Sequence, residues 1–249
     1  MSQQPTIIVP ARLESSRLKR KLLYEVEGKP LIIWTADRIR LEVPEFPLFF
    51  AVDSKELADC LKTFSYDVIM TNKKHLSGTD RIAEANKSIR ADVVINIQAD
   101  EPLIHRSQIK LLASSIEAGH SMTTLASLFV NPDDFYNPNC VKVVVGKNRQ
   151  ALYFSRSPIP YVRDLKGTIA TDWLQDNKCF KHIGIYAYQA SFLKSVVSMN
   201  QGTLESFECL EQLRVLENGE SIHVEISNEQ SLGIDTLEDI EKFKLHLTS

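Results

Sequence analysis

The residues best suited to chemistry near the start of the chain are cations that follow an apolar run, Thr6–Ala11. Within ten positions the chain carries Arg12, Arg17, Lys19, Arg20 and Lys21. In open α/β sheets, ligands bind beyond the carboxyl ends of the strands, where a loop leaving the first strand must lie. Guanidinium forks and ammonium groups there can hold a triphosphate. We therefore predict an anion site, with a solvated basic run as the alternative.

Phosphate loops that depend on glycine are missing from this sequence. The first glycine is Gly28, and neither G-x-x-x-x-G-K-S/T nor G-x-G-x-x-G occurs. Because these patterns place backbone N–H groups against phosphates, their absence excludes the P-loop NTPases and the usual dinucleotide binders.

Composition and charge exclude further classes of protein. A formal net charge of −3 argues against a nucleic-acid binder, whose domain would be strongly basic. The longest apolar stretches, such as 31–34 and 47–52, fall far short of the roughly 20 residues that a membrane span needs. The four cysteines form no C-x-x-C pair, so neither a zinc ribbon nor a redox motif is indicated. No secretory signal pattern is present, and we expect a cytoplasmic protein.

The first half of the chain alternates apolar runs with helical patterns, which predicts βαβ units on a mostly parallel sheet flanked by helices, an α/β fold. Strands are predicted over 6–11, 47–52, 67–71 and 93–98, and helices over 30–40, 55–64 and 79–90. Pro30 and Ser54 are typical residues for the start of a helix.

The second half is less regular, with strands near 122–130, 141–145, 151–155 and 182–188 between Asn/Pro/Asp-rich turns, some of them antiparallel. Apolar residues spaced by three predict one helix over 204–217, ended by Gly219. A strand over 221–227 and a helix over 237–247 follow. We expect one domain over 1–249, with a protruding antiparallel insert near 120–180.

The cationic loop resembles a specific family, the 3-deoxy-manno-octulosonate cytidylyltransferases. Their pattern P-A-R-x-x-S-T/S-R-L-P-G-K is matched by Pro10-Ala11-Arg12, by Ser15-Ser16-Arg17-Leu18 and by Lys21. The resemblance implies that Ala11, Arg12, Arg17 and Lys21 bind the nucleotide, with Arg12 and Lys21 acting in catalysis. Lys19-Arg20 replace the family's Pro-Gly, so this turn must form without the freedom of glycine at positive φ.

A second matching segment is His75–Glu84, which contains the family's S-G-T-E/D-R pattern at the entrance to a helix. The resemblance implies that Ser77 and Arg81 face the nucleotide, where the helix N-terminus favours anions. For Arg81 the alternative is an ordinary salt bridge.

Two acidic segments resemble the family's metal-binding motifs. Ile97–Pro102 is similar to Q-G-D-E-P, with Ala99 in place of glycine, and Gly233–Thr236 is similar to G-V-D-T. Magnesium prefers few carboxylates together with phosphate oxygens and water. The resemblance therefore implies that Asp100, also catalytic, and Asp235 bind Mg²⁺; a helix cap is the alternative for Asp235.

Three further segments resemble the family's sugar-binding motifs: Ala151–Pro160, Lys181–Tyr188 and Leu210–Glu217. On a strand, His182, Gly184 and Tyr186 would share one face. For His182 and Tyr186 the alternative is a place in the core. For Glu211 and Gln212 the alternative is a solvent-facing stripe on an amphipathic helix. The residues implied to bind the sugar are Gln98, Arg156, His182, Tyr186, Glu211 and Gln212.

The motifs occur in the family order from Pro10 to Thr236. The resemblance implies a nucleotide-diphospho-sugar transferase-like fold and transfer of CMP from CTP to an acidic eight-carbon sugar, with release of pyrophosphate. It also implies a homodimer and a role in lipopolysaccharide biosynthesis. Two alternatives stay open: a catalytically degenerate nucleotide- or sugar-binding paralogue, and a glycosyltransferase. The latter usually has D-x-D where this chain has Gln98-Ala99-Asp100.

Overall fold

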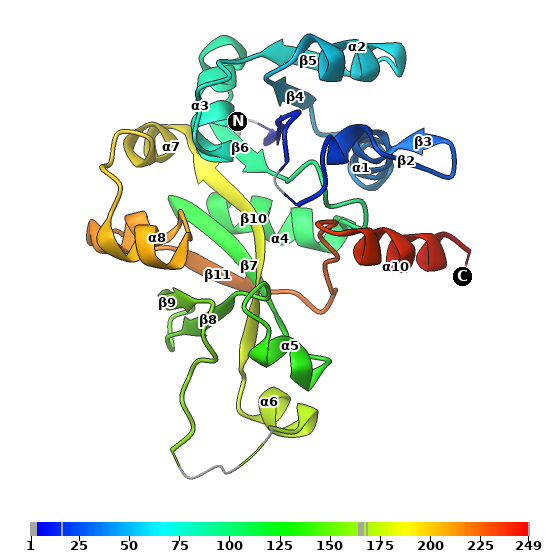
Figure 1. Cartoon of the computed structure of the whole chain (residues 1–249). Helices are drawn as coiled ribbons and strands as arrows, with labels where there is room; N and C mark the ends of the chain where they lie inside the picture. Colours follow the sequence, from blue (N-terminus) through cyan, green and yellow to red (C-terminus); the bar gives the residue numbers. More distant parts are fainter. Residues whose placement is uncertain (1–3, 16, 164–166, 168, 249) are drawn as a thin grey trace.

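One mixed sheet runs through the computed structural model, which describes residues 4–15, 17–163, 167 and 169–248 (Figure 1). Its main path has the strand order β11-β7-β10-β6-β1-β4-β5, and β8 and β9 branch from β10. Its strands are β1 (Thr6–Ala11), β4 (Leu48–Val52), β5 (Asp67–Met70), β6 (Val93–Asn96), β7 (Met122–Leu128), β8 (Lys142–Val145), β9 (Ala151–Ser155), β10 (Phe180–Gln189) and β11 (His223–Ile226). Strands β2 (Glu25–Val26) and β3 (Lys29–Pro30) pair with each other in a separate two-stranded sheet.

Helices occupy much of the chain between the strands. They are η1 (Lys21–Leu23), α1 (Leu31–Glu42), α2 (Lys55–Thr63), α3 (Gly78–Ile89), α4 (Arg106–Glu117), α5 (Pro132–Tyr136), α6 (Thr171–Asp176), α7 (Ala190–Val196), α8 (Thr203–Glu208), α9 (Leu213–Glu217) and α10 (Leu237–Thr248). No helix in the described part of the chain is both long and apolar enough to cross a membrane.

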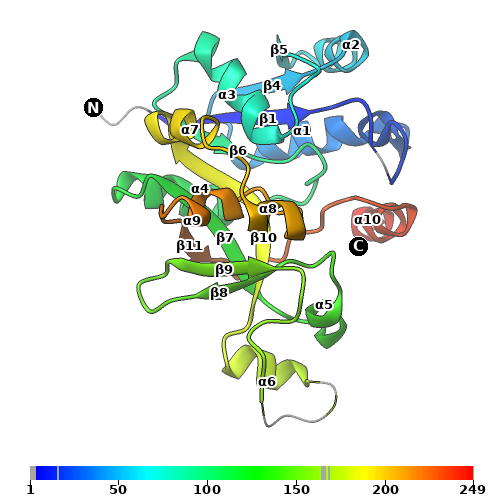
Figure 2. The same ribbon diagram turned by 60° about the vertical axis from the view of Figure 1, so that its left-hand side comes forward.

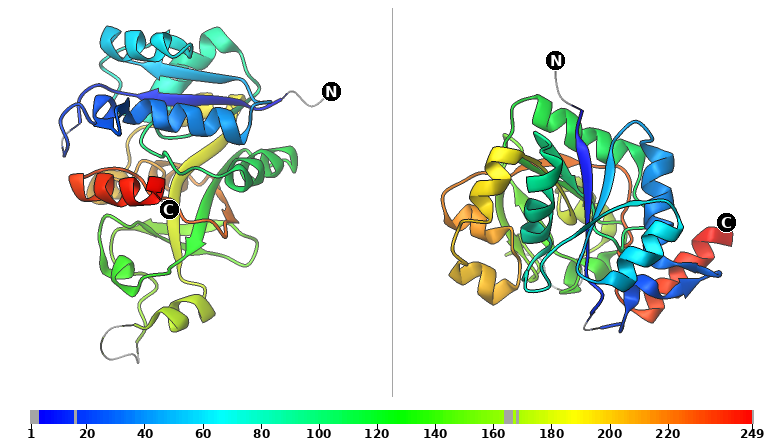
Figure 3. Two further views of the ribbon diagram at one scale, coloured as in Figure 1. Left: turned by 90° about the vertical axis from the view of Figure 1, so that its right-hand side faces the viewer. Right: turned by 90° about the horizontal axis from the view of Figure 1, so that it is seen from above.

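The predicted parallel half of the sheet is confirmed. Strands β6, β1, β4 and β5 are parallel neighbours, and every residue of β1 is buried. Helices lie on both sides of β1 in the view from above (Figure 3). Ile7 and Val9 pack with α1, α2 and α4, whereas Ile8 packs with α3 and α7. A strand buried on both faces has a continuous apolar sequence, which is why residues 6–11 were easy to predict.

The predicted helix starts are also confirmed. Pro30 is the N-cap of α1, and the Ser54 hydroxyl accepts a hydrogen bond from the Leu57 amide at 3.2 Å. Helix α4 was not among the predicted elements. Its N-cap is His105, which shares a capping box with Gln108, whereas N-caps are usually Ser, Thr, Asp or Asn.

The second half turns the sheet antiparallel around one long strand. β10 is antiparallel to β6 on one side and to β7 on the other, and β8 pairs with both β10 and β9. Beyond this branch, α5 and α6 extend from the end of the molecule opposite α2 (Figures 1 and 2). A small separate core, which includes Phe129, Phe135 and Leu174, supports them.

The predicted single helix over 204–217 is wrong. The structure has two short helices, α8 and α9, and Cys209 between them adopts a left-handed conformation with φ 51°. Phe207 is 80% exposed whereas Leu213 is buried, so the apolar residues do not form one face. The break is held from outside, because the Glu208 carbonyl accepts a hydrogen bond from Arg156 at 2.7 Å. Spacing within the segment could not reveal this contact.

Candidate active site

The cationic loop, the segment after β6 and the segment before α10 meet in one cleft of about 190 Å³. The cleft lies at the carboxyl ends of β1 and β6, as the rule for open α/β sheets predicts. Its lining residues are Pro10, Arg12, Glu14, Ser15, Arg17, Lys21, Leu22, Gln98, Ala99, Asp100 and Asp235. Ser16 of the predicted motif is outside the described residues.

Lys21 is the centre of the charge network in this cleft. Its ammonium Nζ lies 2.5 Å from Asp100 Oδ2 and 2.8 Å from Asp235 Oδ1. Arg17 Nη2 lies 2.9 Å from the other oxygen of Asp235. Burial by itself lowers the pKa of Lys21, but the two carboxylates outweigh burial and the pKa is raised. Lys21 is therefore a fixed cation held between two anions.

The turn before Lys21 forms without glycine. Arg20 adopts φ 56° and precedes the short helix η1, which begins at Lys21. A left-handed conformation costs a non-glycine residue roughly 1–2 kcal/mol. The Arg20 guanidinium pairs with Glu56, and the Leu23 amide donates to the Arg20 carbonyl at 3.0 Å. The replacement of Pro-Gly by Lys19-Arg20 thus leaves Lys21 in the cleft.

Asp53 anchors the other end of the cationic loop. One of its oxygens accepts a hydrogen bond from the Leu13 amide at 2.9 Å, and the other lies 3.5 Å from Arg81 Nη2. Arg81 is 3% exposed and also donates to the Thr71 hydroxyl at 2.7 Å. The structure therefore places Arg81 in a buried ion pair that supports the loop. Ala11 ends β1 and leads directly into this loop.

Ala99 does not disturb the cleft, although the family has glycine there. Its side chain is 4% exposed within the main core, and its carbonyl accepts a hydrogen bond from Thr35 at 2.9 Å. The close approach lies elsewhere: a Cβ on Gly78 would stand 3.2 Å from Pro10 Cγ. Gly78 thus allows the start of α3 to approach the end of β1.

Asp100 and Asp235 have the chemistry of a magnesium site. Both carboxylates converge on one ammonium, so they are close enough to share one cation. The helix-cap alternative for Asp235 is wrong, because Asp239 accepts hydrogen bonds from the Thr236 amide and hydroxyl and Thr236 caps α10. In the part of the chain that the structure describes, no three His, Cys, Asp or Glu residues form a metal-binding group. Two carboxylates plus phosphate oxygens and water fit Mg²⁺.

Glu101 is a third acidic residue at this site that sequence reasoning missed. Burial, with the neighbouring Asp100 charge, raises the pKa of its carboxyl to about 7. Its carboxyl accepts a hydrogen bond from Ser231, and the Ile234 amide donates to the Asp100 carbonyl at 2.9 Å. These contacts fasten the segment that carries Asp235 to the segment that carries Asp100. The sequence signal was its place in the segment that resembles Q-G-D-E-P, where only Asp100 and Gln98 were assigned a role.

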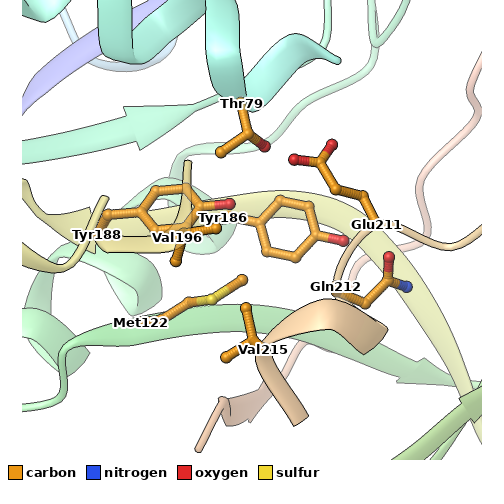
Figure 4. A pocket seen from close by; sticks show the side chains of 8 residues that line it. All are labelled: Thr79, Met122, Tyr186, Tyr188, Val196, Glu211, Gln212 and Val215. Carbon is orange, nitrogen blue, oxygen red and sulfur yellow. The ribbon is translucent and has the colours of Figure 1, made fainter. Parts of the chain in front are cut away.

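A second, smaller cavity of about 20 Å³ lies beside α3, with room for roughly one water molecule (Figure 4). Its lining residues are Thr79, Met122, Tyr186, Tyr188, Val196, Glu211, Gln212 and Val215. Figure 4 shows Glu211 and Gln212 on the same side of the Tyr186 ring, with Thr79 facing Glu211. The break between α8 and α9 is what brings Glu211 and Gln212 into the cavity, so the solvent-facing stripe is wrong.

Glu211 carries the cavity's one acidic group. Burial raises the pKa of its carboxyl, and the hydroxyls of Thr79 and Ser77 oppose that shift. Ser77 is also the N-cap of α3, since its hydroxyl accepts from the Asp80 amide at 3.1 Å. Ser77 therefore lies at the start of α3, within hydrogen-bond reach of Glu211. Gln98, which lines the cleft, donates to Asn96 at 3.2 Å.

His182 lies next to the cavity on β10, in contact with the lining residue Tyr186. Their ring centroids are 5.6 Å apart, and His182 packs edge-on against Phe154 at 4.9 Å. Burial lowers the pKa of His182 to about 3, so the imidazole is neutral at pH 7. Burial also raises the pKa of Tyr186, which keeps its phenol protonated. His182 and Tyr186 thus give this end of the site two neutral hydrogen-bonding groups beside Glu211.

Arg156 does not lie as an open fork in this structure. Its Nε, Nη1 and Nη2 donate to the carbonyls of Glu208, Pro138 and Cys209 at 2.7, 2.9 and 3.4 Å. A bidentate pair with a sugar carboxylate needs two adjacent N–H groups of the guanidinium. Most N–H groups of the Arg156 guanidinium already have partners. Arg156 thus joins the end of β9 to the α8–α9 break, and its sugar-binding role stays a prediction.

Comparisons with known proteins agree with this architecture. The cytidylyltransferase family matches residues 6–222. The chain is 41% identical to 3-deoxy-manno-octulosonate cytidylyltransferase 2 of Actinobacillus pleuropneumoniae, over 98% of each chain. It is 43% identical to the corresponding enzyme of Parabacteroides distasonis, over 94% of each. The structure of a CMP:2-keto-3-deoxy-manno-octonic acid synthetase complexed with CTP superposes with a TM-score of 0.87, at 33% identity and 98% coverage of both chains. The chain therefore belongs to the 3-deoxy-manno-octulosonate cytidylyltransferase family.

Proposed function

We propose that this chain transfers CMP from CTP to the anomeric hydroxyl of 3-deoxy-manno-octulosonate, or of a close analogue, and releases pyrophosphate. The observation that carries the proposal is the convergence of Lys21, Asp100 and Asp235 in one cleft at the end of β1. Similarity over the full length to octulosonate cytidylyltransferases supports the choice of nucleotide and sugar.

The cationic loop would bind the triphosphate. Arg12, Arg17 and Lys21 line the cleft, and Arg81 supports the loop through Asp53. These cations would neutralise charge on the phosphates and hold the α-phosphate in line for attack. Catalysis of this kind depends on positioning and on electrostatic stabilisation.

Asp100 and Asp235 would hold Mg²⁺ once the nucleotide supplies phosphate oxygens. When bound, such an ion lowers the pKa of a hydroxyl and offsets negative charge on phosphate. Lys21 meanwhile keeps both carboxylates paired.

The residues around the cavity beside α3 would contact the sugar, which needs more room than the one water molecule that fits there in this structure. Glu211 and Gln212 offer hydrogen-bond partners for hydroxyl groups, and Tyr186 and His182 add neutral polar groups next to them. Gln98 lies in the cleft and is proposed to contact the sugar from the nucleotide side. Arg156 would join them only after releasing carbonyl partners.

The family resemblance carries further proposals about the chain as a whole. These are Mg²⁺ as the cofactor, a homodimer, a cytoplasmic location and a role in lipopolysaccharide biosynthesis. A single domain with an insert near 120–180 likewise stays a prediction.

Pyrophosphate release by the purified protein with Mg²⁺ tests the proposal. Each nucleoside triphosphate is supplied with and without octulosonate, and release that needs both CTP and the sugar is the expected result. If CTP binds in a calorimeter but no pair reacts, the degenerate paralogue becomes the better interpretation. Turnover of a nucleotide sugar without pyrophosphate would indicate a glycosyltransferase instead.

A further inference from the structure

The hydroxyl of Thr124, on β7, lies where β10 bulges away from it. The register of the two strands shifts between Ile183 and Tyr186 of β10. Thr124 Oγ1 is 2.9 Å from the Ile185 carbonyl oxygen and 3.2 Å from the Ile183 carbonyl oxygen. It is also 2.9 Å from Nε2 of His182. One hydroxyl thus serves three polar neighbours.

Hydrogen counting decides the direction of these bonds. A threonine hydroxyl has one hydrogen and two lone pairs, and a carbonyl can only accept. If the hydroxyl donated to His182, two carbonyl oxygens would face its lone pairs with no hydrogen between them. The hydroxyl therefore donates to the carbonyls of the bulge. The remaining bond must run from His182 Nε2–H to Thr124 Oγ1.

This direction fixes the state of the other ring nitrogen. A neutral imidazole carries one hydrogen, so with Nε2 protonated, Nδ1 is a bare acceptor. In the described part of the chain no group bonds His182 Nδ1, and it is not among the buried unpaired polar atoms, which are Ser127 Oγ and His223 Nδ1. Nδ1 is therefore not sealed in the interior, since the His182 side chain is half-buried. The surrounding rings are Phe154 and Tyr186, which add no charge that would protonate it.

We propose that Thr124 is a positioning residue that fixes His182 in the Nε2–H tautomer, so that Nδ1 accepts a hydrogen bond from a hydroxyl of the bound sugar. The identity of the ligand rests on the proposed function, whereas the tautomer rests on the geometry alone. The site then requires a hydrogen-bond donor at this point. An analogue with that hydroxyl removed or methylated leaves Nδ1 without a partner, and such a loss weakens binding strongly.

Long-range ¹H–¹⁵N correlation spectra of the free protein test the tautomer directly. The chain has six histidines, and His182→Asn identifies the signals of His182 by their loss. We expect a protonated Nε2 and an unprotonated Nδ1 in the wild type and in Thr124→Ser. Thr124→Val should shift the ring towards a tautomer mixture. A protonated Nδ1 in the wild type, or an unchanged ring in Thr124→Val, would overturn the proposal.

Thr123→Val is the matched control. Thr123 precedes Thr124 on β7 and its buried hydroxyl bonds Ser115 at 2.6 Å, away from His182. This variant loses a comparable hydrogen bond but should keep the wild-type tautomer. Once His182→Asn has assigned the signals, the wild-type spectrum reports the tautomer, so poor folding of a threonine variant leaves this part of the test intact.

Kinetics then test the role of the acceptor. Thr124→Val should raise KM for the sugar about tenfold, the equivalent of one hydrogen bond, and leave KM for CTP unchanged. Thr124→Ser should restore the wild-type KM for the sugar. An equal rise of both KM values would indicate a merely structural role and sink the positioning claim. If the tautomer is as expected but no nucleotide and sugar react, the proposed function fails while the Thr124 assignment stands.

Discussion

The two ends of the site use opposite physical means. At the nucleotide end, Lys21 is held by Asp100 and Asp235, whose side chains are 27% and 38% exposed. At the sugar end, His182 and Tyr186 are neutral and half-buried, and Glu211 is the one acidic residue among those that line the cavity. Charge is therefore concentrated where phosphates and a cation would exchange partners, and neutral hydrogen bonds are placed where a sugar would be recognised.

The difference follows from what water does to each kind of contact. Partly exposed ion pairs contribute little net stability, since each charge can be resolvated or paired again. A buried hydrogen-bonding group left unpaired is costly, because water cannot replace its partner. The two partly exposed carboxylates can thus exchange partners, but the Lys21 side chain is 7% exposed and would be costly to leave unpaired. At the sugar end the same penalty applies to hydrogen-bonding groups.

Removal of a carboxylate should have the largest effect. We expect Asp100→Ala to lower kcat at least about 100-fold, the loss typical of one electrostatic group at a transition state, with the fold intact. Pyrophosphate release and circular dichroism measure the two quantities. Asp59→Asn, an exposed change on α2 that breaks only a pair with Lys55, is the control. Near-normal turnover in Asp100→Ala would refute the metal assignment.

Lys21→Met separates phosphate binding from cation binding. The loss of a charge-assisted contact should lower kcat/KM for CTP roughly 10- to 150-fold. The same change leaves Asp100 and Asp235 without their ammonium partner, so Mn²⁺, measured by electron paramagnetic resonance without nucleotide, should bind more tightly than to the wild type. Weaker Mn²⁺ binding would mean that Lys21 organises the two carboxylates and does not compete with the ion.

Glu211→Gln tests the buried acid of the sugar end. Burial raises its pKa in the folded protein above the unfolded value. The folded state then binds the proton more tightly, so wild-type stability falls as pH rises from the unfolded pKa through the folded one. Glutamine cannot titrate. The free energy of unfolding of the variant minus that of the wild type, measured with urea, should therefore be larger at pH 7 than at pH 5. An equal difference at both pH values would contradict the burial argument.

The sequence predicted the helices and strands better than it predicted the contacts between distant residues. Residues 6–11 were assigned correctly because burial on both faces leaves a continuous apolar run, and Ser54 because capping is local. The helix over 204–217 failed because Arg156, far away in sequence, holds its break. The family motifs predicted roles for Asp235 and His182, gave none to Glu101 although it lies in a matched motif, and do not include Thr124. A threonine in a strand carries no sign of the bulge opposite it.

The smallest expected effect is on stability and concerns two residues with a left-handed backbone. They are Arg20 at the nucleotide end, with φ 56°, and Cys209 at the sugar end, with φ 51°. Glycine removes the steric cost of this conformation but increases the entropy of the unfolded chain. We expect Cys209→Gly to stabilise the protein by about 0.5 kcal/mol. Arg20→Gly should gain less, because it also removes the exposed pair with Glu56.

Urea unfolding of both variants measures these differences, and kinetics show whether either turn matters for catalysis. Arg20→Gly should retain kcat/KM for CTP, because Lys21 is held by its two carboxylates and not by the Arg20 side chain. A large loss would show that the arginine itself serves the nucleotide. In the cationic loop, the family's glycine turn would then have been replaced by a turn that adds a positive charge for the nucleotide. The difference in charge between the nucleotide end and the sugar end would be larger than the ion pairs alone indicate.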